Sequence, residues 1–189
     1  SAPIDHARYE TVQSLDQLKG WIERAKNAGI VAVDTETNSL DSINADLIGV
    51  SLALGPNDAC YIPLNHSGSD MFSERPNQIE LSRAVPVLKS LLEDDAVLKV
   101  GQNIKYDILM MKWYGVDVKG NFFDTMIAHY LLEPDLRHKL DYISESLLNY
   151  KMVPIENLIG KRGKNQLSMR DVDPQKVSDY AAEDADVTL

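Results

Sequence analysis

The feature that most constrains the fold is a short apolar run that leads into two acidic residues. Ile30 to Val33 are small or β-branched, and such residues favour a buried β-strand. Asp34 and Glu36 follow directly, and residues i and i+2 of a strand point to one face, about 7 Å apart. Two carboxylates placed there repel each other and lose hydration unless a cation lies between them, and a divalent ion with oxygen ligands is suited to that place. The alternative is a strand end where both acids face water.

The overall composition indicates one globular domain. With 189 residues, 44% of them hydrophobic, the chain is long enough to bury a substantial core. We expect no membrane association, because the sequence has neither an apolar run of 18 residues nor a basic-then-apolar leader. Cys60 is the only cysteine, so an internal disulfide is excluded and a reducing, cytoplasmic setting is favoured.

The charge distribution leaves a nucleic-acid partner open, although the net charge of −10 argues against one at first sight. Residues 1–98 carry 7 basic and 15 acidic residues, whereas residues 99–189 carry 12 and 14. Basic residues cluster at 137–139 and 161–164. Acids that bind metal ions would also weaken the negative field that a substrate meets.

Hydrophobic periodicity and turn residues predict an α/β fold with one mixed sheet flanked by helices. The short turn at 55–58 predicts an antiparallel meander of three strands, and Pro86 is expected to kink or interrupt its helix. Trp21, Trp113, Phe122 and Phe123 are expected in the core. The expected strands are 9–13, 30–33, 46–54, 59–64, 97–100 and 122–124, a loop covers 65–77, and the expected helices are 15–28, 79–92, 104–113, 125–132, 139–148 and 174–189.

Three further residues could take part in chemistry. Asp107 falls in the first turn of a helix that follows a strand, where an acid is also favoured by the helix dipole alone. Tyr180 and Asp184 are one helical turn apart, so they share a face, and the alternative for them is a surface pair. Glu183 and Asp186 fall on other faces of that helix and are expected to be solvated.

Taken together, these residues follow the order of a known constellation. The sequence resembles the tyrosine-containing branch of the DEDD superfamily of 3′–5′ exonucleases, and within it the proofreading domain of bacterial DNA polymerase I. The resemblance covers roughly residues 30–189. It rests on seven short motifs in the same order: 34–37 (DTET), 39–41 (SLD), 99–103 (KVGQN), 105–107 (KYD), 123–126 (FDTM), 163–167 (GKNQL) and 180–186 (YAAEDAD).

The resemblance implies a ribonuclease H-like fold and a single exonuclease domain over residues 1–189, as a fragment of a longer family A DNA polymerase. It also implies two divalent ions, Mg²⁺ or Mn²⁺ with Zn²⁺ as an alternative at one site, which clamp the attacking and leaving oxygens about 3.5–4 Å apart. Asp34, Glu36 and Asp184 would hold one ion, and Asp34 would bridge to the other, supported by Asp107. Tyr180 would orient the attacking water, because a phenol with a pKa near 10 is a poor base.

The same resemblance implies contacts to a DNA strand. Leu40 matches an apolar wedge against the terminal base, and Arg137 matches an arginine directed at a phosphate. For each position an ordinary alternative stays open, namely loop packing, local capping or a solvated side chain. No contact is assigned within 153–162, where the chain departs from the family pattern by one residue. The expected DNA-binding residues are Thr37, Leu40, Gln102, Asn103, Tyr106 and Arg137.

The expected activity is therefore metal-dependent hydrolysis of single-stranded DNA from its 3′ end, by a monomer that is linked to a polymerase domain downstream. One alternative is a ribonuclease D-like enzyme that trims RNA, which the KYD and GKNQ motifs disfavour. A second is a catalytically silent domain that serves as a scaffold. This alternative has to explain why all four acids and the tyrosine of the family are present. A third is a single-strand binder without turnover, whose affinity would not depend on metal.

Overall fold

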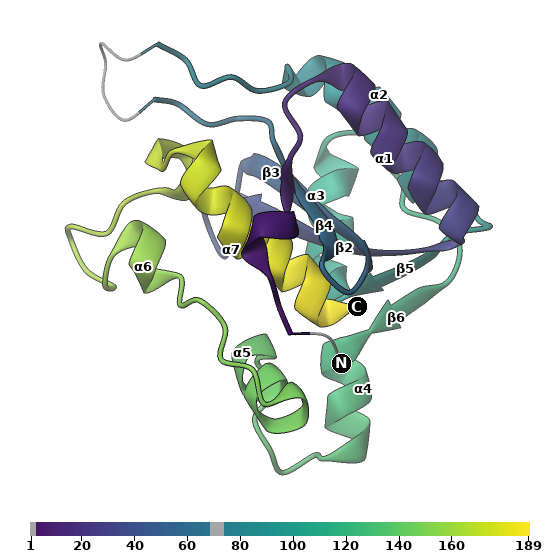
Figure 1. The fold of residues 1–189 in the computed structure, drawn as a ribbon, viewed down its shortest axis with the longest axis vertical. Coiled ribbons are helices and arrows are strands. Elements are labelled where there is room, and N and C mark those ends of the chain that lie inside the picture. The colour runs from purple at the N-terminus through teal and green to yellow at the C-terminus, as the bar shows by residue number, and fades with distance from the viewer. Residues whose placement is uncertain (1–2, 69–73) are drawn as a thin grey trace.

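The computed structural model describes residues 3–68 and 74–189 as one mixed sheet with helices on both faces (Figure 1). The sheet has six strands in the order β1-β4-β3-β2-β5-β6. Residues 69–73 of the expected loop lie outside the described residues, as do residues 1–2. Among the described residues, no helix is long and apolar enough to span a membrane. The strands are β1 Glu10–Thr11, β2 Ile30–Thr37, β3 Leu47–Gly55, β4 Asp58–Pro63, β5 Leu98–Gly101 and β6 Phe122–Asp124.

The helices end close to the residues that the sequence signals indicate. Ser14 and Gln17 form a capping box at the start of α1, and Gly29 ends that helix in the left-handed region with φ 72°. The side chain of Asp124 accepts hydrogen bonds at the start of α4. The helices are α1 Leu15–Ala28, α2 Leu81–Leu92, α3 Ile104–Trp113, α4 Thr125–Leu132, α5 Leu140–Ile143, α6 Glu156–Ile159 and α7 Pro174–Thr188, with short 3₁₀ turns at His6–Arg8 and Met169–Asp171.

Two helix predictions need correction. The interruption predicted at Pro86 is wrong, because α2 runs from Leu81 to Leu92 with Pro86 inside it, while the alternative of a kink stays a prediction. The helix expected over 139–148 is α5 followed by a π-helical turn at Ser144–Leu148. The short helix α6 and both 3₁₀ turns were not expected, because segments of three or four residues carry almost no periodicity.

Strand β2 lies in the middle of the sheet and carries both acids of the opening motif. It pairs antiparallel with β3 and parallel with β5, and β3 pairs antiparallel with β4, which confirms the predicted meander. The strand continues four residues beyond Val33, because Asp34 and Glu36 stay in the ladder, opposite Ser51 and Gly49. The register shifts only after Glu36, so both acids keep the same face.

The two faces of the sheet bury different kinds of side chain. On one face, Val31 and Val33 join the main apolar cluster with α1, α2 and α3. On the other, Ala32 packs with Ala182 and Ala185 of α7, and these small residues allow the helix to lie close to the strands. Side chains alternate between the two faces along β2, so Asp34 and Glu36 lie on the same face as Ala32 and point toward α7.

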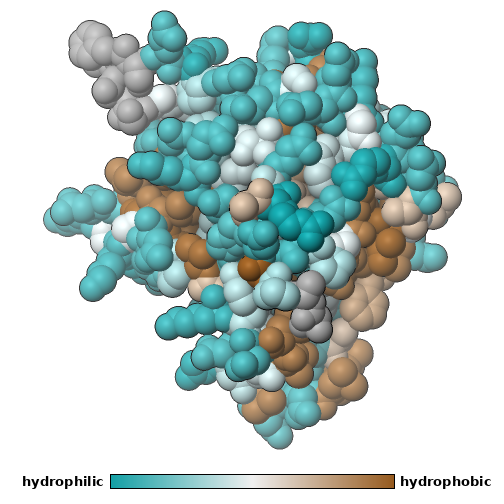
Figure 2. Space-filling view, in the orientation of Figure 1, coloured by the Kyte–Doolittle hydropathy of each residue, from teal (hydrophilic) through white to brown (hydrophobic). Residues whose placement is uncertain are grey.

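The expected core aromatics divide into one correct and three wrong predictions. Trp21 is buried, whereas Trp113 is 64% exposed, with its indole nitrogen donating to the carbonyl of Ser42. Phe122 and Phe123 are about half exposed, because β6 is the edge strand of the sheet and no element covers its outer side among the described residues. Apolar side chains gather on the surface over β6 and α4 as a result (Figure 2).

Gly49→Ala is expected to destabilise the domain strongly. A Cβ at this position would lie 2.5 Å from Cε1 of Tyr61 and closer still to its Cζ and Oη. Tyr61 is fully buried, and its hydroxyl is hydrogen-bonded to Nε2 of His66 at 2.7 Å, so the ring has no room to move aside. We expect a loss of about 3 kcal/mol or more in the free energy of unfolding, measured by urea denaturation.

Gly20→Ala is the matched control for this prediction. Gly20 lies within α1, and an added Cβ there meets nothing within 4 Å. The exchange is expected to stabilise the domain by about 0.5–1 kcal/mol, because alanine favours the helix. Equal unfolding midpoints for the two variants would contradict the packing of Tyr61 against β3.

Candidate active site

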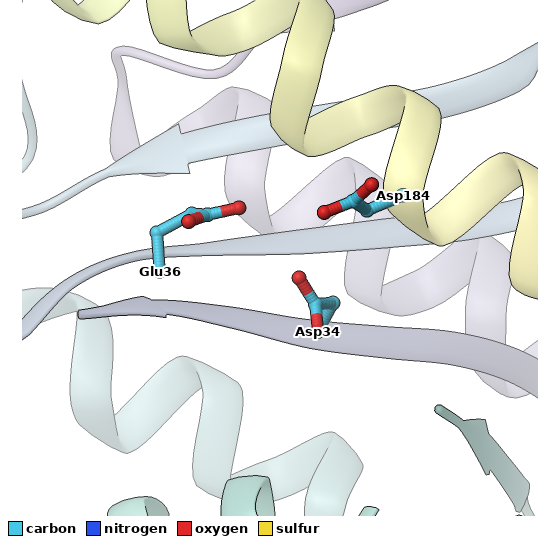
Figure 3. A group of neighbouring side chains, drawn as sticks. All are labelled: Asp34, Glu36 and Asp184. Carbon is cyan, nitrogen blue, oxygen red and sulfur yellow. The ribbon is translucent and has the colours of Figure 1, made fainter. Parts of the chain in front are cut away.

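Three carboxylates meet where β2 faces α7. Asp34 and Glu36 extend from the strand and Asp184 from the helix, and all three point into the same small space (Figure 3). One oxygen of each carboxylate lies within 4.8 Å of the others. The alternation of the strand places the first two acids together, and the alanine contacts of α7 bring the third close to them. The structure thus joins residues that are about 150 positions apart in the sequence.

The electrostatics of this cluster favour a cation. Burial raises the pKa of Asp34 to about 7, and burial together with repulsion from Asp34 and Asp184 raises the pKa of Glu36. Oε1 of Glu36 is buried and has no hydrogen-bond partner in the described part of the chain. The hydroxyl of Ser51, opposite Asp34 in the ladder, is likewise buried without a partner. Hard divalent cations prefer such carboxylate oxygens, so these residues fit a metal site.

Asp107 lies next to the cluster but is not one of its three members. Its Oδ1 accepts hydrogen bonds from the backbone nitrogen of Thr35 at 3.0 Å and from the Thr35 hydroxyl at 2.6 Å. Thr35 is two residues after Val33 and lies on the same face of β2, so this contact is on the α3 side of the strand. Burial and the nearby charge of Asp34 raise the pKa of Asp107. The structure therefore brings Asp107 beside the site, and its oxygen stays bound to Thr35.

Tyr180 lies one turn before Asp184 on α7 and lines the same cavity. Burial and the charge of Asp184 raise the pKa of its phenol above the ordinary value. The hydroxyl therefore keeps its proton at neutral pH, where it can donate a hydrogen bond and is a poor base.

A cavity of about 410 Å³ opens in front of these residues. Asp34, Tyr180 and Asp184 line it together with residues 151–156. The exposed lining residues include two bases, Lys139 and Lys151, and three acids, Asp141, Glu145 and Glu156. The two lysines are the lining groups that can attract a phosphodiester directly, and a cation bound by the carboxylates would add to that attraction.

Three expected DNA-binding residues lie at or beside the loop after β2, namely Thr37 at the end of the strand, Tyr106 on α3 and Leu40 in the loop. The hydroxyls of Thr37 and Tyr106 are 2.7 Å apart, and each also donates to the carbonyl of Ser39. Leu40 is 97% exposed, so its side chain makes almost no contact within the domain. The first two side chains hold the loop in place, and Leu40 is presented to the solvent.

The other expected contacts lie around the start of α3 and between α4 and α5. Gln102 donates to the carbonyl of His138 at 2.7 Å and accepts from the Thr125 hydroxyl, so it ties two segments together. Asn103 precedes α3 with φ 59°, and its side chain accepts from Lys105. Arg137 is exposed in the turn between α4 and α5. Of these, Gln102 lines the cavity.

The prediction that Glu183 and Asp186 are solvated is wrong, since both are buried. Asp186 accepts from the Tyr9 hydroxyl and the Asn57 backbone nitrogen, and Glu183 binds three donors from distant segments. The sequence held one signal of this burial: on the helical wheel Asp186 projects roughly 40° from Ala182, which faces the sheet. The donors themselves come from tertiary contacts that periodicity does not reveal.

The architecture is a ribonuclease H-like fold, which solved structures of similar fold share. The exonuclease (EXO) domain of Nibbler from Aedes aegypti superposes with a TM-score of 0.65 at 16% identity, covering 100% of this chain and 87% of that one. NrnC from Brucella melitensis superposes with a TM-score of 0.64 at 21% identity, covering 96% and 75%. At these identities the likeness establishes the fold.

The chain belongs to the 3′–5′ exonuclease family, whose model matches residues 9–189. DNA polymerase I of Rhizobium leguminosarum is 42% identical over 201 residues, covering 99% of this chain and 20% of the relative. DNA polymerase I of Pseudomonas aeruginosa is 35% identical over 184 residues, covering 96% and 20%. The chain thus spans about a fifth of the length of these relatives. The predicted fold and the predicted exonuclease family are both confirmed.

Proposed function

We propose that this exonuclease domain removes nucleotides from the 3′ end of single-stranded DNA, and that it is a monomeric proofreading module linked to a polymerase domain in a longer protein. One observation carries the catalytic part: three buried or half-buried carboxylates lie within 4.8 Å in a member of an exonuclease family. The link to a polymerase is supported by relatives named DNA polymerase I, of which the chain matches about a fifth.

Two divalent ions, Mg²⁺ or Mn²⁺ with Zn²⁺ as an alternative at one place, are part of the proposal. Asp34, Glu36 and Asp184 would hold the first, and Asp34 would be shared with the second, on the side of Asp107. The unpaired Oε1 of Glu36 and the raised carboxyl pKa values support this assignment. Bound there, such ions supply the positive charge that stabilises the attacking and leaving oxygens of an in-line phosphoryl displacement.

The protein side chains supply orientation and substrate binding. The protonated phenol of Tyr180 would donate a hydrogen bond to the attacking water and fix its direction. Leu40, which folding leaves in solvent, would pack against the terminal base. Gln102, Asn103 and Arg137 would contact the strand, while Thr37 and Tyr106 would hold the loop that carries Leu40.

The test is time-resolved digestion of a 5′-labelled single-stranded DNA oligonucleotide with Mg²⁺ or Mn²⁺, with chelator, and with Asp34→Ala. A ladder that shortens one nucleotide at a time from the 3′ end, and that disappears with chelator and in the variant, would support the proposal. An RNA of the same sequence in parallel separates DNA trimming from RNA trimming. No shortening at high protein concentration with Mn²⁺ would leave the scaffold function as the explanation.

Tyr180→Phe is expected to slow nucleotide release roughly 10- to 100-fold, because the variant removes the hydroxyl that orients the water and leaves the carboxylates in place. The rate is measured under single-turnover conditions, and Mn²⁺ affinity by titration calorimetry is expected to be unchanged. Tyr130→Phe, which removes an exposed phenol from α4, is the matched control and should keep the full rate. A Tyr180→Phe rate equal to that of the control would remove this residue from the mechanism.

A further inference from the structure

Glu183 is a fully buried carboxylate that joins three distant segments of the chain. Its Oε2 lies 2.5 Å from Nε2 of His6 and accepts from the Tyr150 hydroxyl at 2.8 Å. Its Oε1 accepts from the backbone nitrogen of Val153 at 2.8 Å. A buried carboxylate is tolerated where donors surround it in this way. The three contacts connect the N-terminal segment, the chain after α5 and helix α7.

We propose that Glu183 is a positioning residue that holds the wall of the substrate cleft against the catalytic helix, an inference that rests on the proposed exonuclease function. Tyr150 and Val153, its two partners after α5, enclose Lys151 and Met152. Residues 151–156 line the same cavity as Asp34, Tyr180 and Asp184. One carboxylate thus fixes both ends of the segment that carries Lys151, while Met152 is buried.

Apolar packing is the other support of this wall, since Met152 is buried and Ile155 packs against the cluster that contains Val177 and Ala181 of α7. The chain between α5 and α6 joins no strand of the sheet and passes beside α7 (Figure 1). Besides Glu183, Tyr150 is held through its backbone by Ser144, whose hydroxyl donates to the Tyr150 carbonyl at 2.8 Å. Ser144 belongs to the same segment, so that bond does not tie the wall to the helix. Glu183 is the next residue to Asp184, so its hydrogen bonds to Tyr150 and Val153 tie the wall to α7 directly beside the acid cluster.

The chemical consequence concerns the substrate phosphates. Lys151 is exposed on the wall, and its ammonium group is one of the basic groups that line the cavity of a protein with a net charge of −10. Its contribution to binding depends on where the wall holds it, because the attraction between charges falls with distance and is screened in water. Loss of the Glu183 contacts should therefore weaken substrate binding, while the side chains of Asp34, Glu36 and Asp184 stay in place.

Asp186 provides a matched control on the same helix. It is also buried, and it accepts from the Tyr9 hydroxyl at 2.7 Å and from the Asn57 nitrogen at 3.0 Å. Neither partner lines the cleft. Replacing Asp186 removes a buried carboxylate from α7 without releasing the wall, so it reports the purely structural cost of such a change.

The experiment compares Glu183→Ala, Asp186→Ala and Tyr150→Phe in steady-state digestion of a single-stranded oligonucleotide, with melting temperature and Mn²⁺ affinity measured for each. Glu183→Ala is expected to raise KM about tenfold with kcat within about threefold, since the wall moves while the reacting groups stay. Its Mn²⁺ affinity should stay within about twofold of the wild type. Asp186→Ala should lower the melting temperature by a similar amount and keep KM within about twofold of the wild-type value.

Tyr150→Phe keeps the test decisive if Glu183→Ala does not fold. It removes one donor to Glu183 and is expected to raise KM about threefold, with a melting temperature close to that of the wild type. Unchanged KM in the folded variants at Glu183 and Tyr150, or an equal rise in Asp186→Ala, would overturn the inference. A wild-type protein that does not shorten DNA would instead refute the proposed function itself, so the two failures are distinguishable.

Discussion

Asp34→Asn is expected to abolish nucleotide release, by about 10³-fold or more, and at the same time to stabilise the metal-free domain. Asp34 occupies the place where the three carboxylates meet, within 4.8 Å of Glu36 and Asp184. Asparagine keeps the shape of the side chain but removes the charge that a divalent cation requires. Without metal, the same exchange removes the repulsion that raises the pKa of Glu36.

Two measurements together test this prediction. Single-turnover digestion with Mg²⁺ reports the loss of activity, and thermal unfolding at pH 8 in chelator reports a melting temperature higher by a few degrees. Asp179→Asn changes the net charge equally, at an exposed position of α7, and should alter neither quantity. An inactive Asp34→Asn variant with a lower melting temperature would mean that the loss of activity reflects damage to the fold.

The second large effect is a dependence of stability on pH that metal reverses. An acid whose pKa is raised by folding stabilises the folded state below its unfolded pKa, and that contribution is lost as the pH rises through the folded value. For Asp34 the folded pKa is about 7, and the pKa values of Glu36, Asp107 and Asp184 are also raised. The metal-free domain should therefore lose stability between about pH 4 and pH 8 through these groups.

A divalent cation binds the deprotonated carboxylates, so its stabilising effect should grow over the same range. At a hundredfold excess over its dissociation constant, a ligand adds about 2.7 kcal/mol. Differential scanning fluorimetry between pH 5.5 and 8.5, with Mn²⁺ or with chelator, measures both trends. The difference between wild type and Asp34→Asn isolates the cluster from other titrating groups. A melting temperature that does not respond to Mn²⁺ at pH 8.5 would contradict the metal site.

Local signals in the sequence predict much of the fold and part of the site. The capping residues Ser14 and Asp124 and the stop at Gly29 work within one turn of the chain, and the structure has helix ends at each. Asp34 and Glu36 share a face because of strand geometry alone. These features depend on residues that are neighbours in the chain, which is why the order of amino acids is enough to predict them.

The wrong predictions concern residues whose surroundings come from distant segments. Glu183 is buried because His6 and Tyr150 supply donors, and Asp186 because Tyr9 does. Phe122 and Phe123 are exposed because their strand is the last in the sheet, a property of strand order that an apolar pair cannot reveal. The contact of Asp107 with Thr35 likewise depends on the packing of α3 on β2, and the role of Asp107 at the second ion stays a prediction.

The position of α7 has a consequence for the order of events during folding. Its residues follow all six strands in the chain, yet it supplies Tyr180 and Asp184 to a site that begins at Asp34. Closing a loop of that length is slow compared with forming the local meander of β2, β3 and β4. The three-carboxylate cluster therefore forms only when α7 docks on the sheet, and a chain in which α7 has not yet docked holds Asp184 apart from Asp34 and Glu36.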